Sequence, residues 1–380
     1  MAEPSSPLLS SLPFRNTRNL HLLCAVGMML ASALADDVPP VFIFGDSTFD
    51  VGTNNYIPSG ATANFRYYGI DFPHSLPTGR FSNGYNSADL IVRQLGYEES
   101  PPPFLALVLD NSTFQSNILR GVNFASGGAG ILDGTGNRTW GEVIPMVQQV
   151  QQFATVQGNI TWLLGQNESA KFFNSSLFFI SVGSNDIFDH YLYDNATVSQ
   201  PELMAALQSN YTAHLTALYN LGARKFGIVS IPPVGCCPYA RLQNLNKTGS
   251  PGCLTDMNNY AQAFYATISG LLQNLTSQLQ GMIYSLGDAY NMTSTLMDVP
   301  LVLGIENIEE ACCGSGLLNA AGPCNITQDP KLCPNRYEYL FWDWFHPTQY
   351  VAQKAAIALF TGDLRFVSPM NFSQLAQASA

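Results

Sequence analysis

Short, strongly apolar segments alternate with longer amphipathic segments along most of the chain. Apolar runs rich in Phe, Ile, Val and Leu are typical of strands buried on both faces of a sheet. Apolar residues three or four apart are typical of helices that cover such a sheet. Predicted strands span 41–44, 121–125, 177–182, 225–231 and 282–286, and predicted helices span 86–95, 142–157, 201–222, 255–281 and 349–360. The alternation predicts parallel strands joined by right-handed crossovers in a three-layer α/β/α sandwich.

Three of the predicted strands run directly into glycines and small polar residues. Gly45, Asp46 and Ser47 follow the first strand, the segment 126–130 follows the second, and 183–186 follows the third. The carboxyl ends of parallel strands share the edge of the sheet at which ligands bind, so these groups are expected to meet there. Ser47 is the candidate nucleophile, although a lone serine after a strand is more often a cap of the next turn.

A second candidate group lies near the end of the chain, where Asp343 and His346 are three residues apart. At this spacing the carboxylate can accept a hydrogen bond from Nδ1 of the imidazole and leave Nε2 free as a base. Taken alone, such a pair is more often a capping or surface pair. Together with Ser47 it supplies the nucleophile, base and orienting acid of acyl transfer. His214 lies in a predicted helix and His190 has no carboxylate three residues before it, and His346 is the preferred base.

Acyl transfer also requires hydrogen-bond donors for the negative oxygen of the tetrahedral intermediate. The expected donors are the backbone N–H of Ser47, the N–H of Gly127 or Gly128, and the side-chain amide of Asn185. Glycines directly after a strand let backbone amides approach a ligand closely. The glycine segment lacks the Gly-Lys-Ser/Thr ending of a phosphate-binding loop and the spacing of a dinucleotide-binding loop.

Residues 1–35 differ in composition from the rest of the chain. Arg15 and Arg18 precede an apolar run over 20–34 that ends in small residues, as in a secretory signal peptide. The run is short for a membrane span, so an uncleaved anchor is the minor alternative, and no other apolar stretch is long enough to span. We therefore expect one domain over 36–380, soluble and secreted, with no stable membrane span.

The charge of the chain argues against one class of partner. The net charge is −11, and loss of Glu3, Arg15 and Arg18 with the signal peptide makes it −12. Such a surface repels phosphate backbones, and no cluster of basic residues offsets it. Nucleic acid is therefore not an expected partner.

Secretion gives meaning to the Asn-x-Ser/Thr triplets, which behind a signal peptide predict N-linked glycans on segments that face water. Twelve triplets occur, at Asn111, Asn137, Asn159, Asn167, Asn174, Asn195, Asn210, Asn246, Asn274, Asn291, Asn325 and Asn371.

Secretion also favours disulfides over zinc for the cysteines. Of eight cysteines, Cys24 lies in the predicted signal peptide and seven follow it. Cys253 is expected to pair with Cys236 or Cys237. Two more bridges are expected among Cys312, Cys313, Cys324 and Cys333, which leaves one thiol unpaired.

Five short motifs follow one another along nearly all of the mature chain. They are 44–47 (Phe-Gly-Asp-Ser) with 50–55, 79–84 (Gly-Arg-Phe-Ser-Asn-Gly), 123–130 (Asn-Phe-Ala-Ser-Gly-Gly-Ala-Gly), 183–186 (Gly-x-Asn-Asp) and 343–348 (Asp-x-x-His-Pro-Thr). In these motifs and their order the chain resembles the plant-type GDSL esterases/lipases of the SGNH hydrolase superfamily.

The resemblance implies a fold and a set of site residues. It implies a five-stranded parallel, flavodoxin-like sheet with strand order 2-1-3-4-5. Ser47, His346 and Asp343 would form the catalytic triad, with Ser47, Gly127 and Asn185 as oxyanion donors and no cofactor or metal. The substrate would be a small-molecule or polymeric ester, and the location would be extracellular, in the cell wall or apoplast.

Some positions depart from the family pattern. Thr48 stands where the family carries Leu, which should leave the backbone at the preceding serine unchanged. Trp344 and Phe345 are bulkier than expected and would narrow the acyl pocket. Cys236 and Cys237 form a doublet where one cysteine is typical, which makes Cys237 the candidate free thiol.

Three functions remain under consideration on the sequence alone. The first is a secreted serine esterase or lipase that hydrolyses carboxylic esters. The second is an acyltransferase that uses the same acyl-enzyme to build extracellular polyesters. The third is an inactive secreted binding protein, which the intact Ser47, Asn185, Asp343 and His346 argue against.

Overall fold

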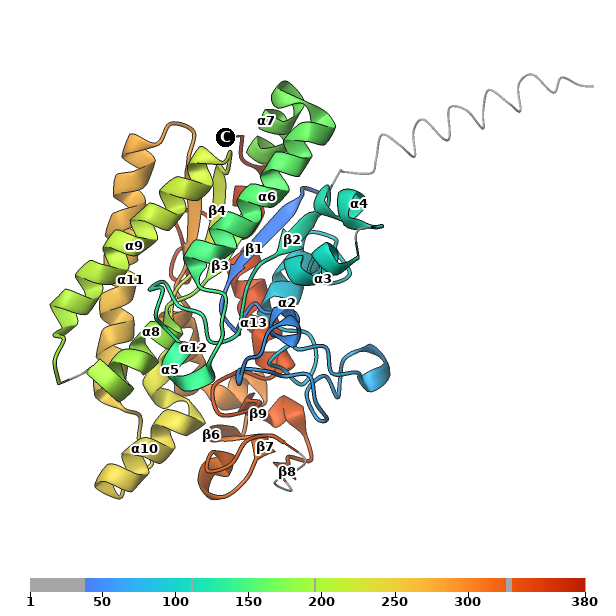
Figure 1. The fold of residues 1–380 in the computed structure, drawn as a ribbon. Coiled ribbons are helices and arrows are strands. Elements are labelled where there is room, and N and C mark those ends of the chain that lie inside the picture. Colours follow the sequence, from blue (N-terminus) through green and yellow to red (C-terminus); the bar gives the residue numbers. More distant parts are fainter. Residues whose placement is uncertain (1–37, 111, 195, 326–329, 380) are drawn as a thin grey trace, which may run out of the picture. The chain divides into compact units, whose positions relative to one another are not determined.

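A computed structural model of the chain describes residues 38–379, apart from 111, 195 and 326–329 (Figure 1). The predicted signal peptide, 1–35, lies outside the described residues, as do Asn111 and Asn195. The segment from Pro39 onward packs as one unit. The predicted start of the mature domain at residue 36 stays a prediction.

The central sheet of this unit has six strands in the order β10-β5-β4-β3-β1-β2. Its strands are β1 (Val41–Gly45), β2 (Gly121–Asn123), β3 (Leu177–Ser181), β4 (Lys225–Val229), β5 (Ile283–Gly287) and β10 (Val367–Ser368). The first five are parallel and follow the expected order 2-1-3-4-5. The expected count of five was too low, because β10 adds an antiparallel edge strand to β5. Two residues are too short to give a periodic signal.

Alternate residues of the strands enter two different apolar cores, which explains the continuous apolar runs in the sequence. Phe42 and Phe44 of β1 pack with α6 (Met146–Leu164), α9 (Gln200–Asn220) and α11 (Thr255–Gln278) on one face. Val41 and Ile43 pack on the other face, with α2 (Ser87–Arg93), α13 (Gln349–Thr361) and α14 (Phe372–Gln377). The three-layer α/β/α prediction is confirmed (Figure 1).

The remaining α-helices have at most 11 residues each. They are α3 (Phe104–Leu109), α4 (Phe114–Ile118), α5 (Asn137–Trp140), α7 (Gln166–Ser175), α8 (Ser184–Asp189), α10 (Pro238–Thr248) and α12 (Ala289–Asp298). The sequence pattern did not predict them. The predicted helix at 142–157 begins later, at Met146, because Pro145 takes the N-cap position in extended conformation.

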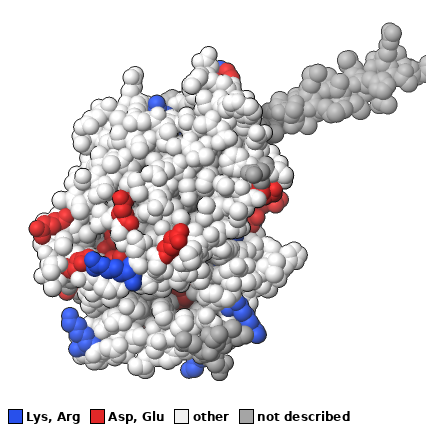
Figure 2. All heavy atoms as spheres, viewed as in Figure 1, with Lys and Arg blue, Asp and Glu red and all other residues white. Residues whose placement is uncertain are grey.

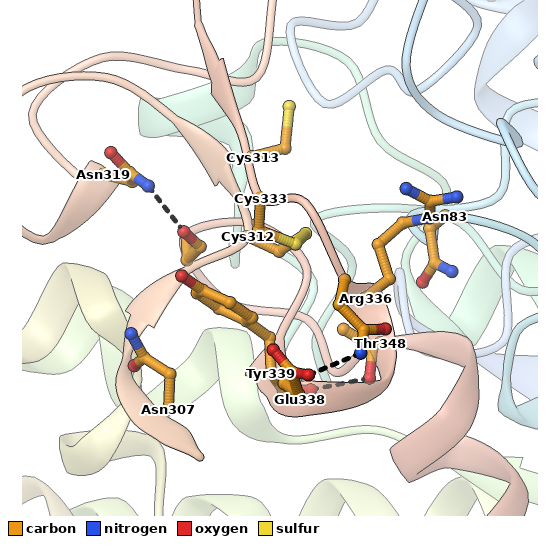
Figure 3. The surroundings of a disulfide bond; sticks show 12 residues. Asn83, Asn307, Cys312, Cys313, Asn319, Cys333, Arg336, Glu338, Tyr339 and Thr348 are labelled. Atoms are coloured by element: carbon orange, nitrogen blue, oxygen red, sulfur yellow. Dashed lines mark hydrogen bonds between the residues drawn. A yellow bond between two sulfur atoms is a disulfide. The ribbon is translucent and has the colours of Figure 1, made fainter. Parts of the chain in front are cut away.

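Two small sheets lie between α12 and α13 in the chain. Strand β6 (Asn307–Ala311) pairs in parallel with β9 (Tyr339–Phe341), and β7 (Cys313–Gly314) pairs antiparallel with β8 (Lys331–Leu332). One disulfide joins Cys312 to Cys333 (Figure 3). A second joins Cys313 to Cys324. These bridges fasten the segment that leads into the Asp343–His346 turn.

The other predicted bridge forms as one of its two alternatives, between Cys236 and Cys253. Cys237 is free and buried, as the resemblance implied.

Charged side chains are sparse on the face shown in Figure 2, where Asp, Glu, Lys and Arg are scattered and the basic ones form no cluster. None of the sequon asparagines among the described residues is buried. No helix within the described part of the chain is both long and apolar enough to cross a membrane.

Candidate active site

A tight turn at the carboxyl end of β1 presents Ser47. Gly45 adopts a φ of 140°, and a Cβ atom there would collide with the carbonyl oxygen of Ser181 on β3, so this position requires glycine. The N–H of Asp46 donates to that same carbonyl at 3.0 Å. Asp46 then accepts from the N–H of Thr48 at 2.9 Å. The turn is thereby fixed to the neighbouring strand, with Ser47 at the edge of the sheet.

Gln149 of α6 holds the start of this turn through two hydrogen bonds to Gly45. Its Oε1 accepts from the N–H of Gly45 at 2.8 Å, and its Nε2 donates to the carbonyl of Gly45 at 2.8 Å. Gln149 is fully buried in the apolar face of α6, and its Nε2 also donates to Ile144. In the sequence, a glutamine among the apolar residues Met146 and Val150 of a helix is the signal that could have indicated this contact.

Asp343 and His346 reach Ser47 from the turn between β9 and α13. Nε2 of His346 lies 2.7 Å from Oγ of Ser47. Nδ1 of His346 lies 2.8 Å from Oδ1 and 2.9 Å from Oδ2 of Asp343. The structure therefore brings together the three side chains that were expected to act together, in the expected order of contacts.

Asp343 sits in a site that favours its ionised form. It is 4% exposed, and its Oδ1 accepts from the backbone N–H of Phe345 at 2.9 Å and of His346 at 2.8 Å. Burial opposes the charge, but the charge and hydrogen bonds of His346 and the two amides outweigh it and hold the pKa of Asp343 below its usual value. Tyr68 adds a further donor, with its hydroxyl 2.7 Å from Oδ2.

The glycine segment after β2 lies beside Ser47, but its first glycine is not free to donate into the site. The N–H of Gly127 donates to Oδ2 of Asp50 at 2.8 Å. An N–H engaged by a buried carboxylate is not available to an oxyanion, so this contact favours Gly128 over Gly127 as the donor. Gly128 lines the cavity instead, with a φ of 82°. A Cβ atom at Gly128 would crowd the ring of Trp140, so glycine is required here too.

Asp50 is the anchor of this arrangement and was missed as a site residue. Besides Gly127, it accepts from the N–H groups of Gly52 and Thr53, each at 2.7 Å. Burial raises the pKa of Asp50 to about 6 despite these bonds. It joins the turn after Ser47 to the glycine segment, and its position three residues after Ser47 was the available signal.

Asn185 lies at the start of α8 and lines the same cavity. Its Nδ2 donates one hydrogen to the carbonyl of Ala129 at 2.9 Å, which orients the amide and leaves its second hydrogen. Among the described residues no acceptor takes the N–H of Ser47 or of Gly128. Ser47, Gly128 and Asn185 thus each carry a donor hydrogen at the cavity.

The next residue, Asp186, holds the far end of the glycine segment. Its carboxylate accepts from the N–H groups of Ile131 at 2.9 Å and Leu132 at 3.0 Å, and from Oγ1 of Thr135 at 2.7 Å. Burial raises the pKa of Asp186 to about 6.

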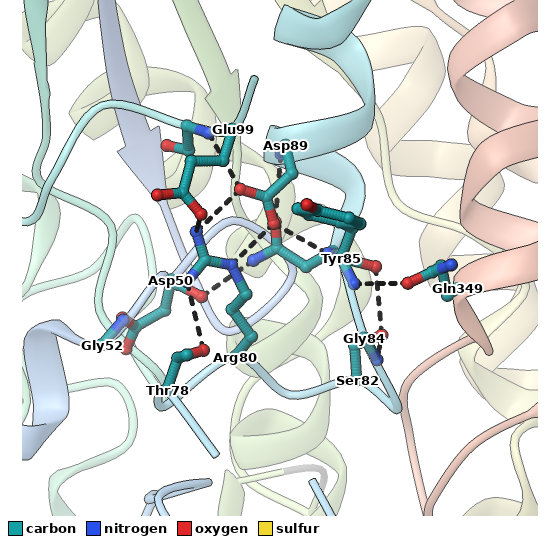
Figure 4. A network of polar contacts seen from close by, with 12 residues as sticks. Asp50, Gly52, Thr78, Arg80, Ser82, Gly84, Tyr85, Asp89, Glu99 and Gln349 are labelled. Atoms are coloured by element: carbon teal, nitrogen blue, oxygen red, sulfur yellow. Dashed lines mark hydrogen bonds and ion pairs between the residues drawn. The ribbon is translucent and has the colours of Figure 1, made fainter. Parts of the chain in front are cut away.

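The loop 53–84 contributes to the lining of the cavity at Ser47. It is held by a buried ion pair (Figure 4). Nε of Arg80 lies 2.7 Å from Oδ2 of Asp89 on α2, and Nη2 lies 2.8 Å from Oδ1. Both side chains are almost fully buried. Asp89 also caps α2 through the N–H of Asn86 at 2.9 Å. Both partners are buried, so loss of either one would leave an uncompensated charge and loosen the loop.

A cavity of about 650 Å³ opens at Ser47. Its wall is mostly apolar. Its lining includes aromatic side chains and also small and aliphatic side chains of α12 and α13. The aromatic ones include Phe65, Trp140, Phe188, Tyr239 and Phe345. Trp344 and Phe345 line it, as expected from the sequence. Within the described part of the chain no group of three or more His, Cys, Asp or Glu is arranged to hold a metal ion.

Comparison with known proteins shows the family of the chain. The family model described as GDSL-like Lipase/Acylhydrolase matches residues 41–359. Similar proteins from Arabidopsis thaliana include GDSL esterase/lipase At4g16230, 36% identical over 346 residues that make up 89% of this chain and 91% of that protein. GDSL esterase/lipase At1g33811 is 37% identical over 348 residues, 89% of this chain and 91% of that protein. The resemblance inferred from the motifs is confirmed, and the chain belongs to the GDSL-like lipase/acylhydrolase family.

Proposed function

We propose that the protein is a secreted serine esterase that hydrolyses carboxylic esters through an acyl-enzyme. The observation that carries this proposal is the continuous contact from Ser47 Oγ through the ring of His346 to Asp343, at the mouth of an apolar cavity. Membership of a family of lipases and acylhydrolases supports it.

In the proposed first half-reaction, Ser47 Oγ attacks the ester carbonyl while Nε2 of His346 takes the hydroxyl proton. Asp343 holds the ring by Nδ1 and stabilises the imidazolium that forms. The carbonyl oxygen becomes an oxyanion, which the N–H groups of Ser47 and Gly128 and the side-chain amide of Asn185 stabilise. His346 then gives its proton to the leaving alcohol oxygen. Water attacks the acyl-enzyme by the same steps and releases the acid.

We also propose secretion and N-glycosylation. Three disulfides are characteristic of proteins that mature in an oxidising compartment. The N-terminal pattern of residues 1–35 supports the same route. The sequon asparagines at the surface, such as Asn137, Asn167, Asn246 and Asn274, are open to glycosylation.

The decisive experiment compares the wild type with Ser47→Ala on p-nitrophenyl esters. We expect turnover to fall by at least about 10³-fold, because the remaining groups cannot form an acyl-enzyme. A fluorophosphonate probe should label the wild type and leave Ser47→Ala unlabelled, while circular dichroism shows both folded. Turnover that survives in the alanine variant would refute the proposal. Products are analysed with and without glycerol, because an acyltransferase would release the acylglycerol.

A further inference from the structure

The loop 53–84 contributes one hydrogen bond directly to the acid of the triad. The hydroxyl of Tyr68 donates to Oδ2 of Asp343 at 2.7 Å, across 275 positions of sequence. The backbone amides of Phe345 and His346 both donate to Oδ1. Oδ2 receives Nδ1 of His346 and the hydroxyl of Tyr68. Tyr68 therefore donates to Oδ2, the carboxylate oxygen that receives no hydrogen bond from the backbone of the turn.

We propose that Tyr68 is a positioning residue of the reaction, which holds the Asp343 carboxylate in the orientation and charge state that His346 requires. The inference rests on the proposed function, because it assigns Tyr68 a role through Asp343 and His346.

The ring of Tyr68 is fixed so that its hydroxyl has one direction. Tyr68 is 7% exposed and packs edge-on against the rings of Phe65, Phe81 and Trp342, with centroids 5.1, 6.3 and 6.2 Å away. Trp342 immediately precedes Asp343 and is fully buried. A hydroxyl on a ring held from three sides loses little further entropy when it donates, which makes the contact effective.

Tyr68 stays protonated under the conditions of ester hydrolysis. Burial and the adjacent Asp343 carboxylate raise the pKa of Tyr68 well above its usual value. The hydroxyl is thus a constant donor, and its hydrogen bond to an ionised acceptor is of the strong, charge-assisted kind.

The loop is clamped to the same C-terminal segment at further points. Arg336 Nη2 lies 2.8 Å from Oδ1 of Asp71. The N–H of Gln349 donates to Oδ1 of Asn83 at 2.8 Å. These contacts join the loop to the chain before and after the Asp343–His346 turn. Tyr68, in contrast, contacts the side chain of Asp343 itself. Loss of its hydroxyl therefore leaves the clamp intact.

The sign of the expected effect follows from charge. With Tyr68 present, part of the negative charge of Asp343 is taken up by the hydroxyl. Without it, the carboxylate attracts the imidazolium more strongly, so less of the free base should be available to Ser47 at mild acid pH. The carboxylate is also freer to rotate, which lowers the rate at saturating pH.

Other titratable groups lie near Asp343 and His346, and their contributions to the pH profile must be distinguished from the effect of Tyr68. Asp46 faces His346, and burial raises the pKa of Asp46 to about 6, inside the pH range of the expected change. Cys237 faces Asp343, and burial raises the pKa of its thiol to about 12, outside that range. The ring of His346 is therefore observed directly by NMR, alongside the kinetic pH profile.

The test is Tyr68→Phe in the full-length enzyme, with Tyr67→Phe as the matched control. Tyr67 precedes it in the same loop, is half-buried, and its hydroxyl does not bond to Asp343, which Tyr68 contacts instead. For Tyr68→Phe we expect kcat to fall about tenfold, with KM changed less than about twofold. The acid limb of kcat/KM and the NMR titration of His346 should move up by roughly half a pH unit or more. Tyr67→Phe should match the wild type in all four.

A double-mutant cycle shows whether Tyr68 acts through Asp343. In the Asp343→Asn background, adding Tyr68→Phe should change kcat by less than about twofold, because the acceptor of the bond has lost its charge. An equal loss in both backgrounds, or an unmoved His346 titration with activity reduced, would overturn the inference. Should Tyr68→Phe fold poorly, difluorotyrosine at position 68 strengthens the same bond and should move the acid limb down; an unmoved limb would overturn the inference.

The outcomes separate this inference from the proposed function. If Ser47→Ala abolishes turnover while Tyr68→Phe leaves rate, pH profile and His346 titration unchanged, the esterase proposal stands and the role of Tyr68 falls. If Ser47→Ala keeps its turnover, both fall.

Discussion

Oγ of Ser47 and Nε2 of His346 lie 2.7 Å apart, although 299 positions separate them in the chain. The parallel sheet makes this possible, because Ser47 follows β1 at the carboxyl edge and His346 lies just before α13, which packs against α2 on the same face. The contact depends on the whole sheet and on the disulfide-linked segment before β9. Ester hydrolysis is therefore expected only when both the sheet and this segment are folded.

Replacement of Asn185 tests the oxyanion site. For Asn185→Ala we expect kcat to fall about 10²–10³-fold with little change in KM, because a donor aimed at the oxyanion acts mainly in the transition state. Loss of its bond to Ala129 should lower the free energy of unfolding by only about 1 kcal/mol. Steady-state kinetics and urea unfolding measure the two effects. A loss of less than tenfold in a folded variant would remove Asn185 from the site.

Much of the fold followed from local sequence pattern, and the exceptions have physical reasons. Strands β1 and β3 are buried throughout, so their apolar runs are unmistakable. Strand β10 has two residues, and β7 and β8 are held by disulfides more than by any periodicity. Such elements depend on contacts that no local pattern records.

The site was predictable where chemistry needs a particular residue type, and less so where geometry decides. Ser47, Asp343 and His346 were recognisable from type and spacing. Gly127 and Gly128 are identical in sequence, and only the carboxylate of Asp50, which engages the first, separates them. Tyr68 stands in a loop rich in aromatic residues, where nothing in the sequence indicates which ring reaches the acid.

The pH dependence of stability should carry a contribution from Asp186. Burial raises the pKa of Asp186 to about 6 from an ordinary 3.8, so the folded chain keeps a proton that the unfolded chain releases between these values. This contribution is fully present below about pH 4 and is lost as the pH rises to about 6, at a cost of about 1–3 kcal/mol. In Asp186→Asn the decline of unfolding free energy over this range should be shallower.

Asp133→Asn is the control for that measurement, because Asp133 is exposed and lies within the segment 131–135 that Asp186 contacts. Urea unfolding at pH 4.5 and 6.5 gives the difference for each protein. Asp46 and Asp50 act in the same direction, so the wild type and the control should both decline. Equal slopes in the wild type and Asp186→Asn would contradict the assignment.

Cys237 should be a thiol that is present but unreactive in the folded protein. It is 3% exposed, and burial raises the pKa of the thiol to about 12, so almost no thiolate exists at neutral pH. Ellman's reagent should find no reactive thiol in the native mature protein and one after unfolding in guanidinium. Cys237→Ser should show none in either state. Rapid labelling of the native wild type would show that the thiol is accessible.

The apolar wall of the cavity predicts a preference for esters with longer acyl chains. Each CH₂ group that enters the cavity should raise kcat/KM by up to about fourfold, until the space is filled. We expect p-nitrophenyl butyrate and octanoate to react faster than the acetate. Phe345 lines this wall against Phe188 and Tyr239, so Phe345→Ala should move the optimum to longer chains with little effect on the acetate. Ile357→Ala, on the exposed side of α13, is the control and should keep the wild-type profile. An optimum at acetate in the wild type would mean that the acyl chain does not enter the cavity.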